Sequence, residues 1–384
     1  MKNILIVGGT SGLGWALANE LVANEQVENI YIIGRTLHNE ITNSKIKFFA
    51  QNLLVNDSSY FKQFSNIDAL FITVGAGRVA KFDNLSEKEV NMEIDINYKI
   101  VTKILKQFYS KIQSSDDFKV AVISSIAGMI NSPLFSVYGA SKAAVSALIQ
   151  SLNIELEKNG SNNRILDVRP GHIAGTRFAN NQEIDIKPAQ KVAIEIIAAL
   201  EERKQLLIPN YEETYKQVID RNRNDPHEFG INSYDYKVDN NRVTEKPQIK
   251  IGYMSGTFDL FHVGHLNILK KAKQYCDYLV VGVHKDASHK NKTVFVPLEE
   301  RMEIVRSIKY VDEVIVSLPE DNEVRNIIPY NLLFVGSDYK GTERFKRYEE
   351  EFSQLDDVEI IYFPYTKSTS STQLRAAISK DNKE

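Results

Sequence analysis

Apolar and polar positions along the first part of the chain alternate between two kinds of segment. Short apolar, β-branched runs, typical of buried strands, are followed by longer runs with a helical period. Strands are predicted at residues 4–7, 29–34, 45–53, 68–77, 121–128 and 205–209. Helices are predicted at residues 15–25, 91–105, 136–152 and 189–203. This alternation predicts an α/β fold with a doubly wound parallel sheet.

The pattern changes at residues 221–248, which lose both periods and are rich in Asn, Asp and charge. Such composition is typical of a connector between domains. The alternation then resumes, with a helix at residues 266–275. Further strands are predicted at residues 249–254, 278–284, 313–318, 332–338 and 358–365. We therefore expect two Rossmann-like domains, over residues 1–220 and 249–384, joined by a linker.

Composition narrows the class of protein. A chain of 384 residues with 43% hydrophobic and 25% charged residues fits two ordinary globular domains. A net charge of -3 gives no reason to expect nucleic acid as a partner. The first apolar run is too short to span a membrane, so no membrane insertion is expected. The single cysteine, Cys276, excludes an internal disulfide and fits the cytoplasm; no protein metal site is predicted.

A glycine-rich turn, GGTSGLG over residues 8–14, stands between the first strand and the first helix. In that context the glycines allow a tight turn, a close approach to a pyrophosphate and close helix packing. A tight turn without a ligand is the alternative. Arg35 follows the next strand, where an arginine can hold a 2′-phosphate, which favours NADPH while leaving NADH possible. The predicted binding residues of this part are Gly8, Thr10, Ser11, Gly12, Leu13, Gly14 and Arg35.

Four polar residues of the first domain have a catalytic pattern. Ser125 follows a buried strand, Tyr138 and Lys142 lie one turn apart on the next helix, and Asn97 lies on an earlier helix. A Tyr and Lys four positions apart are weak evidence alone, so their position after the glycine turn and the serine carries the interpretation. Together these features resemble the short-chain dehydrogenase/reductase family over residues 1–215.

The resemblance implies a role for each residue. Tyr138 would protonate a carbonyl oxygen as hydride arrives, and Lys142 would lower the tyrosine pKa and hold the nicotinamide ribose. Ser125 would bind the substrate oxygen, and Asn97 would hold a water in a proton relay. Further coenzyme contacts are implied for Asn52, Leu53, Gly75, Pro170, Gly171, Ile173 and Thr176. Little chain remains after Thr176 for a substrate lid, which suggests an open site.

A second motif, GTFDLFHVGH over residues 256–265, occupies a strand-to-helix turn. His262 and His265 can share one face of the first helical turn, beside unpaired backbone N–H groups that favour phosphate. A solvated helix face is the alternative. The motif resembles the HxGH nucleotidyltransferase superfamily, and most closely the glycerol-3-phosphate cytidylyltransferases, over residues 249–379.

This second resemblance implies cytidylyl transfer from CTP. His262 and His265 would stabilise the transition state, and Mg²⁺ would bridge phosphates. Phosphate or nucleotide contacts are implied for Gly256, Thr257, Phe258, Lys292, Arg301, Asp338, Ser370, Ser371 and Thr372. Tyr365 stands where the family carries an arginine, which weakens the expectation for CTP, and ATP is the alternative nucleotide.

The two resemblances on one chain suggest successive steps. We expect a sugar carbonyl, in a phosphorylated substrate, to be reduced and an alditol phosphate to be converted to a CDP-alditol for surface polysaccharide synthesis. The order of the steps stays open. The alternative is a transferase whose first domain binds a dinucleotide without turnover. Expected partners are sugar or polyol phosphates, and the families imply a homodimer or homotetramer.

Overall fold

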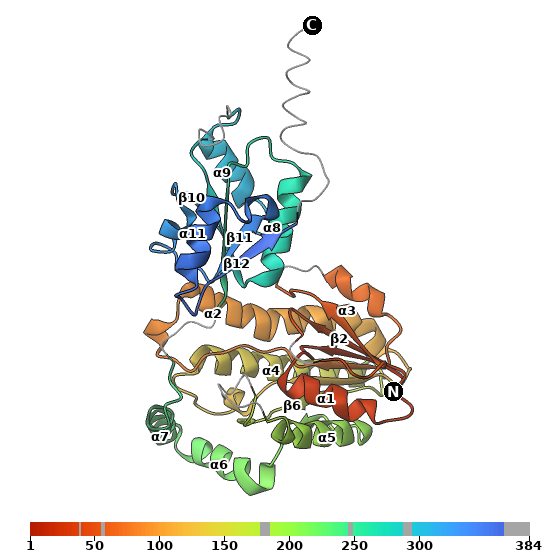
Figure 1. Cartoon of the computed structure of the whole chain (residues 1–384). Helices are drawn as coiled ribbons and strands as arrows, with labels where there is room; N and C mark the ends of the chain where they lie inside the picture. The colour runs from red at the N-terminus through yellow and green to blue at the C-terminus, as the bar shows by residue number, and fades with distance from the viewer. Residues whose placement is uncertain (38–39, 55–57, 177–184, 245–248, 287–293, 365–384) are drawn as a thin grey trace. The chain divides into compact units, whose positions relative to one another are not determined.

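The computed structural model describes the chain except residues 38–39, 55–57, 177–184, 245–248, 287–293 and 365–384. The chain forms two compact units, Met1–Gln248 and Ile249–Glu384, each built on its own parallel sheet (Figure 1). Among the described helices, none combines the length and the apolar character that crossing a membrane requires.

The first unit holds a seven-stranded sheet in the order β3-β2-β1-β4-β5-β6-β7, with parallel pairing throughout. The order reverses between β1 and β4, and ligands of such sheets bind at the carboxyl ends of the strands beside that point. The predicted doubly wound sheet is thus confirmed. The strands are β1 Asn3–Val7, β2 Asn29–Gly34, β3 Ile46–Ala50, β4 Ala69–Ile72, β5 Lys119–Ile123, β6 Ile165–Val168 and β7 Leu206–Leu207.

Helices cover both faces of this sheet, so β4 is apolar at every position and β1 at all but its first. Ile4 and Ile6 pack into the core on the side of α1 (Gly12–Val22) and α5 (Lys187–Glu201), which lie side by side (Figure 1). Leu5 and Val7 of β1 pack into the opposite core, with α3 (Ile100–Gln113) and α4 (Ser136–Lys158). The helix α2 (Glu87–Ile94) and the π-helical turn η3 (Asp95–Lys99) lead into α3.

The strand β6 was not predicted, because Asp167 interrupts a run of only four residues. The carboxylate of Asp167 is buried beside β5 and binds two neighbours. It accepts hydrogen bonds from the Ser124 hydroxyl and from Arg169, whose Nη2 lies 2.7 Å away. A paired acid can therefore occupy a central strand.

The described part of residues 221–248, which were expected to be a linker, is largely helical. The helix α6 (Lys216–Asn224) is followed by α7 (Pro226–Asp239), and the Asp225 side chain caps α7 by accepting from the backbone N–H of His227 and Glu228. Few side chains of these helices are buried, so the sequence shows no apolar period. Polar anchors hold α7 instead, because Lys237 Nζ donates to the Pro133 carbonyl at 2.8 Å.

The second unit has a five-stranded parallel sheet in the order β10-β9-β8-β11-β12, which reverses between β8 and β11. Core side chains on one face belong to α8 and α9, and those on the other face to α10 and α11. The strands are β8 Ile251–Gly256, β9 Tyr278–Val283, β10 Glu313–Val316, β11 Leu332–Gly336 and β12 Glu359–Phe363. The helices are α8 Val263–Tyr275, α9 Leu298–Arg306, α10 Asp321–Val324 and α11 Glu343–Phe352.

Candidate active sites

The glycine turn after β1 fits a pyrophosphate. Gly8 and Gly12 have φ angles of +97° and +52°, in the left-handed region that favours glycine. A Cβ on Gly14 would lie 2.5 Å from Thr73 Oγ1, so α1 starts against the turn. At Gly12 the first neighbour of a Cβ would be the Thr176 methyl at 3.7 Å, so the backbone is open there. Among the described residues the Ser11 side chain makes no cap bond, which leaves first-turn N–H groups for an anion.

The other residues predicted near the adenosine part lie at the ends of β2 and β3. Arg35 is exposed directly after β2, and Thr10 packs against Gly34, where a Cβ would lie 2.5 Å from Thr10 Cγ2. Asn52 is buried and its side-chain oxygen accepts from the Leu54 N–H at 3.0 Å. Leu53 packs against the α3 and α4 side of the core, and Leu13 against the α1 and α5 side.

The stretch after β6 folds back over the glycine turn and Ser125. The Pro170 carbonyl accepts from the Ile126 N–H at 3.1 Å and from Ser125 Oγ at 3.4 Å. The Thr176 hydroxyl donates to the Ile173 carbonyl at 3.0 Å. At Gly171 a Cβ would lie 1.6 Å from the Tyr215 hydroxyl, so only glycine fits. These residues come together at the carboxyl edge of the sheet.

The four residues of the predicted catalytic group meet around Gly75, beyond the carboxyl end of β4. Lys142 Nζ donates to the Ile123 carbonyl at 2.9 Å and would lie 3.4 Å from a Cβ on Gly75. The Tyr138 hydroxyl is hydrogen-bonded to Ser125, and Lys142 Nζ lies 5.7 Å from the centroid of the Tyr138 ring. Asn97, in the π-helical turn, donates to the Ala76 carbonyl at 2.7 Å and accepts from its N–H at 2.9 Å. The Asn97 side chain thus binds the backbone of Ala76 through both of its polar atoms, and its role in holding a relay water stays a prediction.

Burial acts against the lowering of the Tyr138 pKa that the resemblance implies. Burial is the main cause that raises the pKa of Tyr138, outweighing the opposite effect of the Ser125 hydrogen bond. Burial also lowers the pKa of Lys142 to about 8. Both groups are removed from water, and Lys142 Nζ binds backbone carbonyls.

The sequence pattern did not indicate Glu93, a second acid–base group beside Tyr138. Glu93 lies on α2, is 4% exposed and accepts from the Arg78 N–H at 3.1 Å. Burial raises the pKa of Glu93 to about 7, and its charge raises the pKa of Tyr138. Arg78 is itself buried and binds Glu89 at 2.9 Å. Only the fold brings these residues to the tyrosine, because α2 carries an ordinary polar pattern.

Loss of the positive charge of Lys142 is expected to lower the rate of coenzyme use at high pH. Its pKa of about 8 means that the ammonium is charged below that pH and neutral above it. We therefore expect kcat/KM for NADPH to fall about tenfold per pH unit above this value. Rates between pH 6 and 10 test this, and Lys142→Arg, which stays charged, should remove the decline. A flat wild-type profile would contradict the assignment.

The two histidines of the second motif stack at the start of α8. His262 caps the helix: its Nδ1 accepts from the Gly264 N–H at 3.0 Å, and its own N–H donates to His265 Nδ1 at 3.4 Å. The ring centroids are 4.0 Å apart. Because each Nδ1 accepts a hydrogen bond, the neutral rings carry their proton on Nε2. Burial lowers the pKa of His262, which favours this neutral form.

The loop that precedes the histidines is held in an uncommon conformation. Phe258 and Leu260 have φ angles of +52° and +49°, which non-glycine residues rarely adopt. Between them the buried Asp259 accepts from the N–H groups of Phe295 and Val296 at 3.1 and 3.0 Å. A Cβ on Gly256 would lie 2.9 Å from the Phe258 ring. The loop is thus fixed against the segment before α9.

Arg301 does not extend toward a ligand as predicted. It is 1% exposed on α9, where backbone carbonyls of three separate segments surround it. Its donors bind the carbonyls of Thr257 at 2.6 Å, His284 and Val296 at 2.8 Å and Lys285 at 3.0 Å. Arg301 therefore positions the motif loop. Asp338 lies exposed after β11 at the same sheet edge, whereas Lys292, Ser370, Ser371 and Thr372 lie outside the described residues.

Arg301→Met is expected to destabilise the second unit by about 3 kcal/mol, because buried carbonyls lose their charged donor. Hydrogen exchange of the amides of β8 and β9 in the full chain measures this. Arg306→Met is the matched control, since Arg306 lies on the same helix with an exposed side chain paired to Glu303. Equal protection in the two variants would contradict the positioning role.

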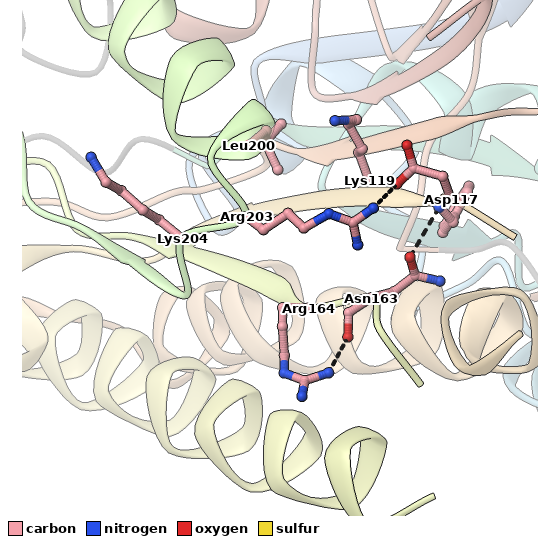
Figure 2. Close-up of a pocket in the computed structure, with 8 residues that line it drawn as sticks. Asp117, Lys119, Asn163, Arg164, Leu200, Arg203 and Lys204 are labelled. Atoms are coloured by element: carbon pink, nitrogen blue, oxygen red, sulfur yellow. Dashed lines mark hydrogen bonds and ion pairs between the residues drawn. The ribbon is translucent and has the colours of Figure 1, made fainter. Parts of the chain in front are cut away.

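A pocket lies at the amino-terminal edge of the first sheet, opposite the edge that carries the candidate active site (Figure 2). Positively charged side chains of this pocket form ion pairs with carboxylates. Arg203 pairs with Asp117 at 3.1 Å, and Lys119 pairs with Glu201 at 2.6 Å. Residues at this edge precede β5 and β6, whereas Ser125 and Pro170 follow them. The pocket is lined by Asp117, Phe118, Lys119, Asn163, Arg164, Leu200, Arg203 and Lys204.

The described residues do not form a metal site. No group of three or more His, Cys, Asp or Glu side chains among them could hold an ion. The acid of the second motif, Asp259, is used by two backbone N–H groups. The expected Mg²⁺ was an ion that bridges the phosphates of the substrates, and it stays a prediction.

Comparisons with known proteins match a different family to each of the two units. The short chain dehydrogenase family matches residues 2–187, and the cytidylyltransferase-like family matches residues 253–377. The chain is 37% identical over 127 residues to glycerol-3-phosphate cytidylyltransferase of Bacillus subtilis, a match that covers 32% of this chain and 92% of that protein.

Two further matches concern the first unit. An uncharacterized oxidoreductase of Schizosaccharomyces pombe is 32% identical over 191 residues, covering 47% of this chain and 64% of that protein, less than two thirds of its length. A crystal structure of a short-chain dehydrogenase from Streptomyces avermitilis is 19% identical with a TM-score of 0.49, covering 62% of this chain and 100% of that one. The chain belongs to the cytidylyltransferase-like family through its second unit, and its first unit is an oxidoreductase domain of the short-chain dehydrogenase type.

Proposed function

We propose that this chain is a bifunctional enzyme that makes a CDP-alditol. The first unit reduces the carbonyl of a sugar phosphate with NADPH, and the second transfers a cytidylyl group from CTP to an alditol phosphate, in the cytoplasm and for surface polysaccharide. One observation carries the proposal: each sheet presents its own reacting side chains at the carboxyl edge, Ser125 with Tyr138 and His262 with His265. The relative from Bacillus subtilis is named for glycerol 3-phosphate, itself an alditol phosphate, which supports the acceptor class.

The reduction would use the buried group around Gly75. The glycine turn and the first turn of α1 would hold the pyrophosphate of NADPH, which supplies the hydride when bound. Ser125 would donate a hydrogen bond to the substrate oxygen, and Tyr138 would give it a proton. Lys142 would hold positive charge beside the phenol as the proton leaves. The charge of Glu93 would help to keep this proton on the Tyr138 hydroxyl, because it raises the pKa of Tyr138.

The transfer would need positioning and charge stabilisation, with no protein nucleophile. An oxygen of the alditol phosphate would attack the α-phosphorus of CTP in line, and pyrophosphate would leave. The Nε2–H groups of His262 and His265 would donate to the phosphate oxygens on which charge develops. The strained loop at Phe258, fixed by Asp259 and Arg301, would keep the backbone near these oxygens.

A second candidate gives the first unit a binding role without turnover. The burial of Tyr138 and Lys142 beside Ser125 favours catalysis, because a binding module needs no such costly arrangement. For the second unit the alternative nucleotide is ATP. Joining both sites on one chain would raise the local concentration of the shared intermediate only modestly if the sites act independently.

Parallel assays on the full chain test the proposal. NADPH oxidation is measured with phosphorylated ketoses and aldoses, and pyrophosphate release with CTP or ATP and a panel of alditol phosphates. We expect NADPH oxidation with at least one sugar phosphate and release with CTP well above that with ATP. Equal rates with both nucleotides would overturn the cytidylyl assignment. The absence of NADPH oxidation across the panel would leave the binding role for the first unit.

A further inference from the structure

The end of α7 and the residues after it cross the carboxyl edge of the first sheet beside the catalytic group. Lys237 binds the loop after β5, through the Pro133 carbonyl at 2.8 Å. Arg242 Nη2 lies 3.2 Å from His172 Nδ1, in the stretch after β6. The Thr244 N–H donates to the Val79 carbonyl at 2.9 Å, in the loop after β4. Residues 237–244 thus contact the loops after β4, β5 and β6, and the loop after β5 carries Ser125.

Residues 237–244 are held by hydrogen bonds at both of their ends. Arg78 Nη1 donates to the Thr244 carbonyl at 2.7 Å, and Arg78 is itself buried against Glu89. Lys237 also donates to the hydroxyls of Ser132 and Ser233 at 3.2 and 3.0 Å. The Lys237 side chain and the Thr244 backbone, at the two ends of residues 237–244, are therefore occupied by structural bonds.

Arg242 differs from the other arginines at this edge. Arg78 is paired with Glu89 and Arg169 with Asp167, whereas among the described residues Arg242 makes no ion pair and its side chain contacts the His172 ring. It is partly exposed. Its neighbours respond to its positive charge: after burial, Arg242 is the cause that lowers the pKa of His172 and of Lys237.

The stretch that carries His172, the imidazole that contacts Arg242, is positioned by Tyr215. The Tyr215 hydroxyl occupies the space beside Gly171 and hydrogen-bonds the backbone of His172. Pro170, two residues earlier, accepts from Ser125 Oγ at 3.4 Å. His172 and Arg242 are therefore tied to the same short stretch as the catalytic serine.

We propose that Arg242, supported by His172, binds the phosphate of the carbonyl substrate in the first active site. A guanidinium offers a planar fork of donors that matches a phosphate, and a neutral His172 that accepts at Nδ1 adds an Nε2–H donor. The inference rests on the proposed reduction and gives it a substrate class: a phosphomonoester of a hydroxylated aldehyde or ketone.

The kinetic test compares each sugar phosphate of the panel with its free sugar and with the matching sugar acid. In the wild type we expect kcat/KM to be higher for the phosphate, and Arg242→Gln to reduce that preference by about 10- to 100-fold, the loss of a charged hydrogen bond. Arg223→Gln, an exposed arginine on α6, is the control. Equal wild-type rates for phosphate and free sugar, or for phosphate and sugar acid, would overturn the phosphate subsite while leaving the reductase in place.

A binding measurement keeps the inference testable if no sugar is reduced. The ring signals of His172, assigned with His172→Gln, are followed by NMR as inorganic phosphate is added to the full chain. We expect saturable shifts in the wild type and in Arg223→Gln, and their loss in Arg242→Gln. The absence of a saturable shift in the wild type would overturn the subsite, whatever the assays of the proposed function show.

Discussion

Tyr138→Phe is expected to lower kcat for NADPH oxidation by about 10²- to 10⁴-fold, the usual contribution of a general acid. The change removes only the hydroxyl that binds Ser125. The ring would keep its stacking on Phe135, whose centroid lies 4.2 Å away, so the fold should be retained. Single-turnover oxidation of NADPH with the preferred sugar phosphate measures the effect on the chemical step.

Two comparisons separate a loss of the chemical step in Tyr138→Phe from a loss of folded structure. Pyrophosphate release from CTP should be unchanged in Tyr138→Phe, because the second unit has its own sheet and core. Tyr109→Phe, which removes a surface hydroxyl bound to Glu155, should behave like the wild type in both assays. If Tyr138→Phe oxidises NADPH within a few-fold of the wild-type rate, Tyr138 is not the acid.

His262→Asn is expected to reduce pyrophosphate release from CTP by about 10²- to 10³-fold, the usual loss when one preorganised donor is removed. Asparagine is a favoured N-cap residue, so it can accept from the backbone of the first turn as His262 does from Gly264. The variant therefore removes the imidazole and its stacking on His265 without removing the cap of α8. Steady-state rates at saturating CTP and alditol phosphate report the loss.

The control for this variant is His227→Asn, an exposed histidine in the first turn of α7. NADPH oxidation should be the same in His262→Asn as in the wild type. A parallel loss of both activities would point to misfolding, and hydrogen exchange of α8 would detect it. Unchanged pyrophosphate release in a folded His262→Asn variant would exclude the histidine pair as the source of charge stabilisation.

Both folds could be predicted from local pattern. A strand buried between two helical layers must be apolar on both faces, and β1 shows this, with Ile4 to Val7 fully buried. The glycine turn and the HxGH turn stand directly after first strands, so the sequence also placed them at the points where strand order reverses. The prediction failed where polar contacts do the work of apolar ones, as in β6 with Asp167 and in α7 with Lys237.

The sequence by itself determined the two sheets, their glycine turns and the identity of the candidate reacting side chains, because these depend on neighbours within a few positions. The tertiary structure decided what each polar side chain contacts. Arg301 reaches carbonyls between 5 and 44 positions away, and Glu93 and Arg242 reach the surroundings of Tyr138 and His172 from other elements. The physical reason is desolvation: a charge taken out of water must find its partners wherever the fold brings them, and no local pattern records that choice.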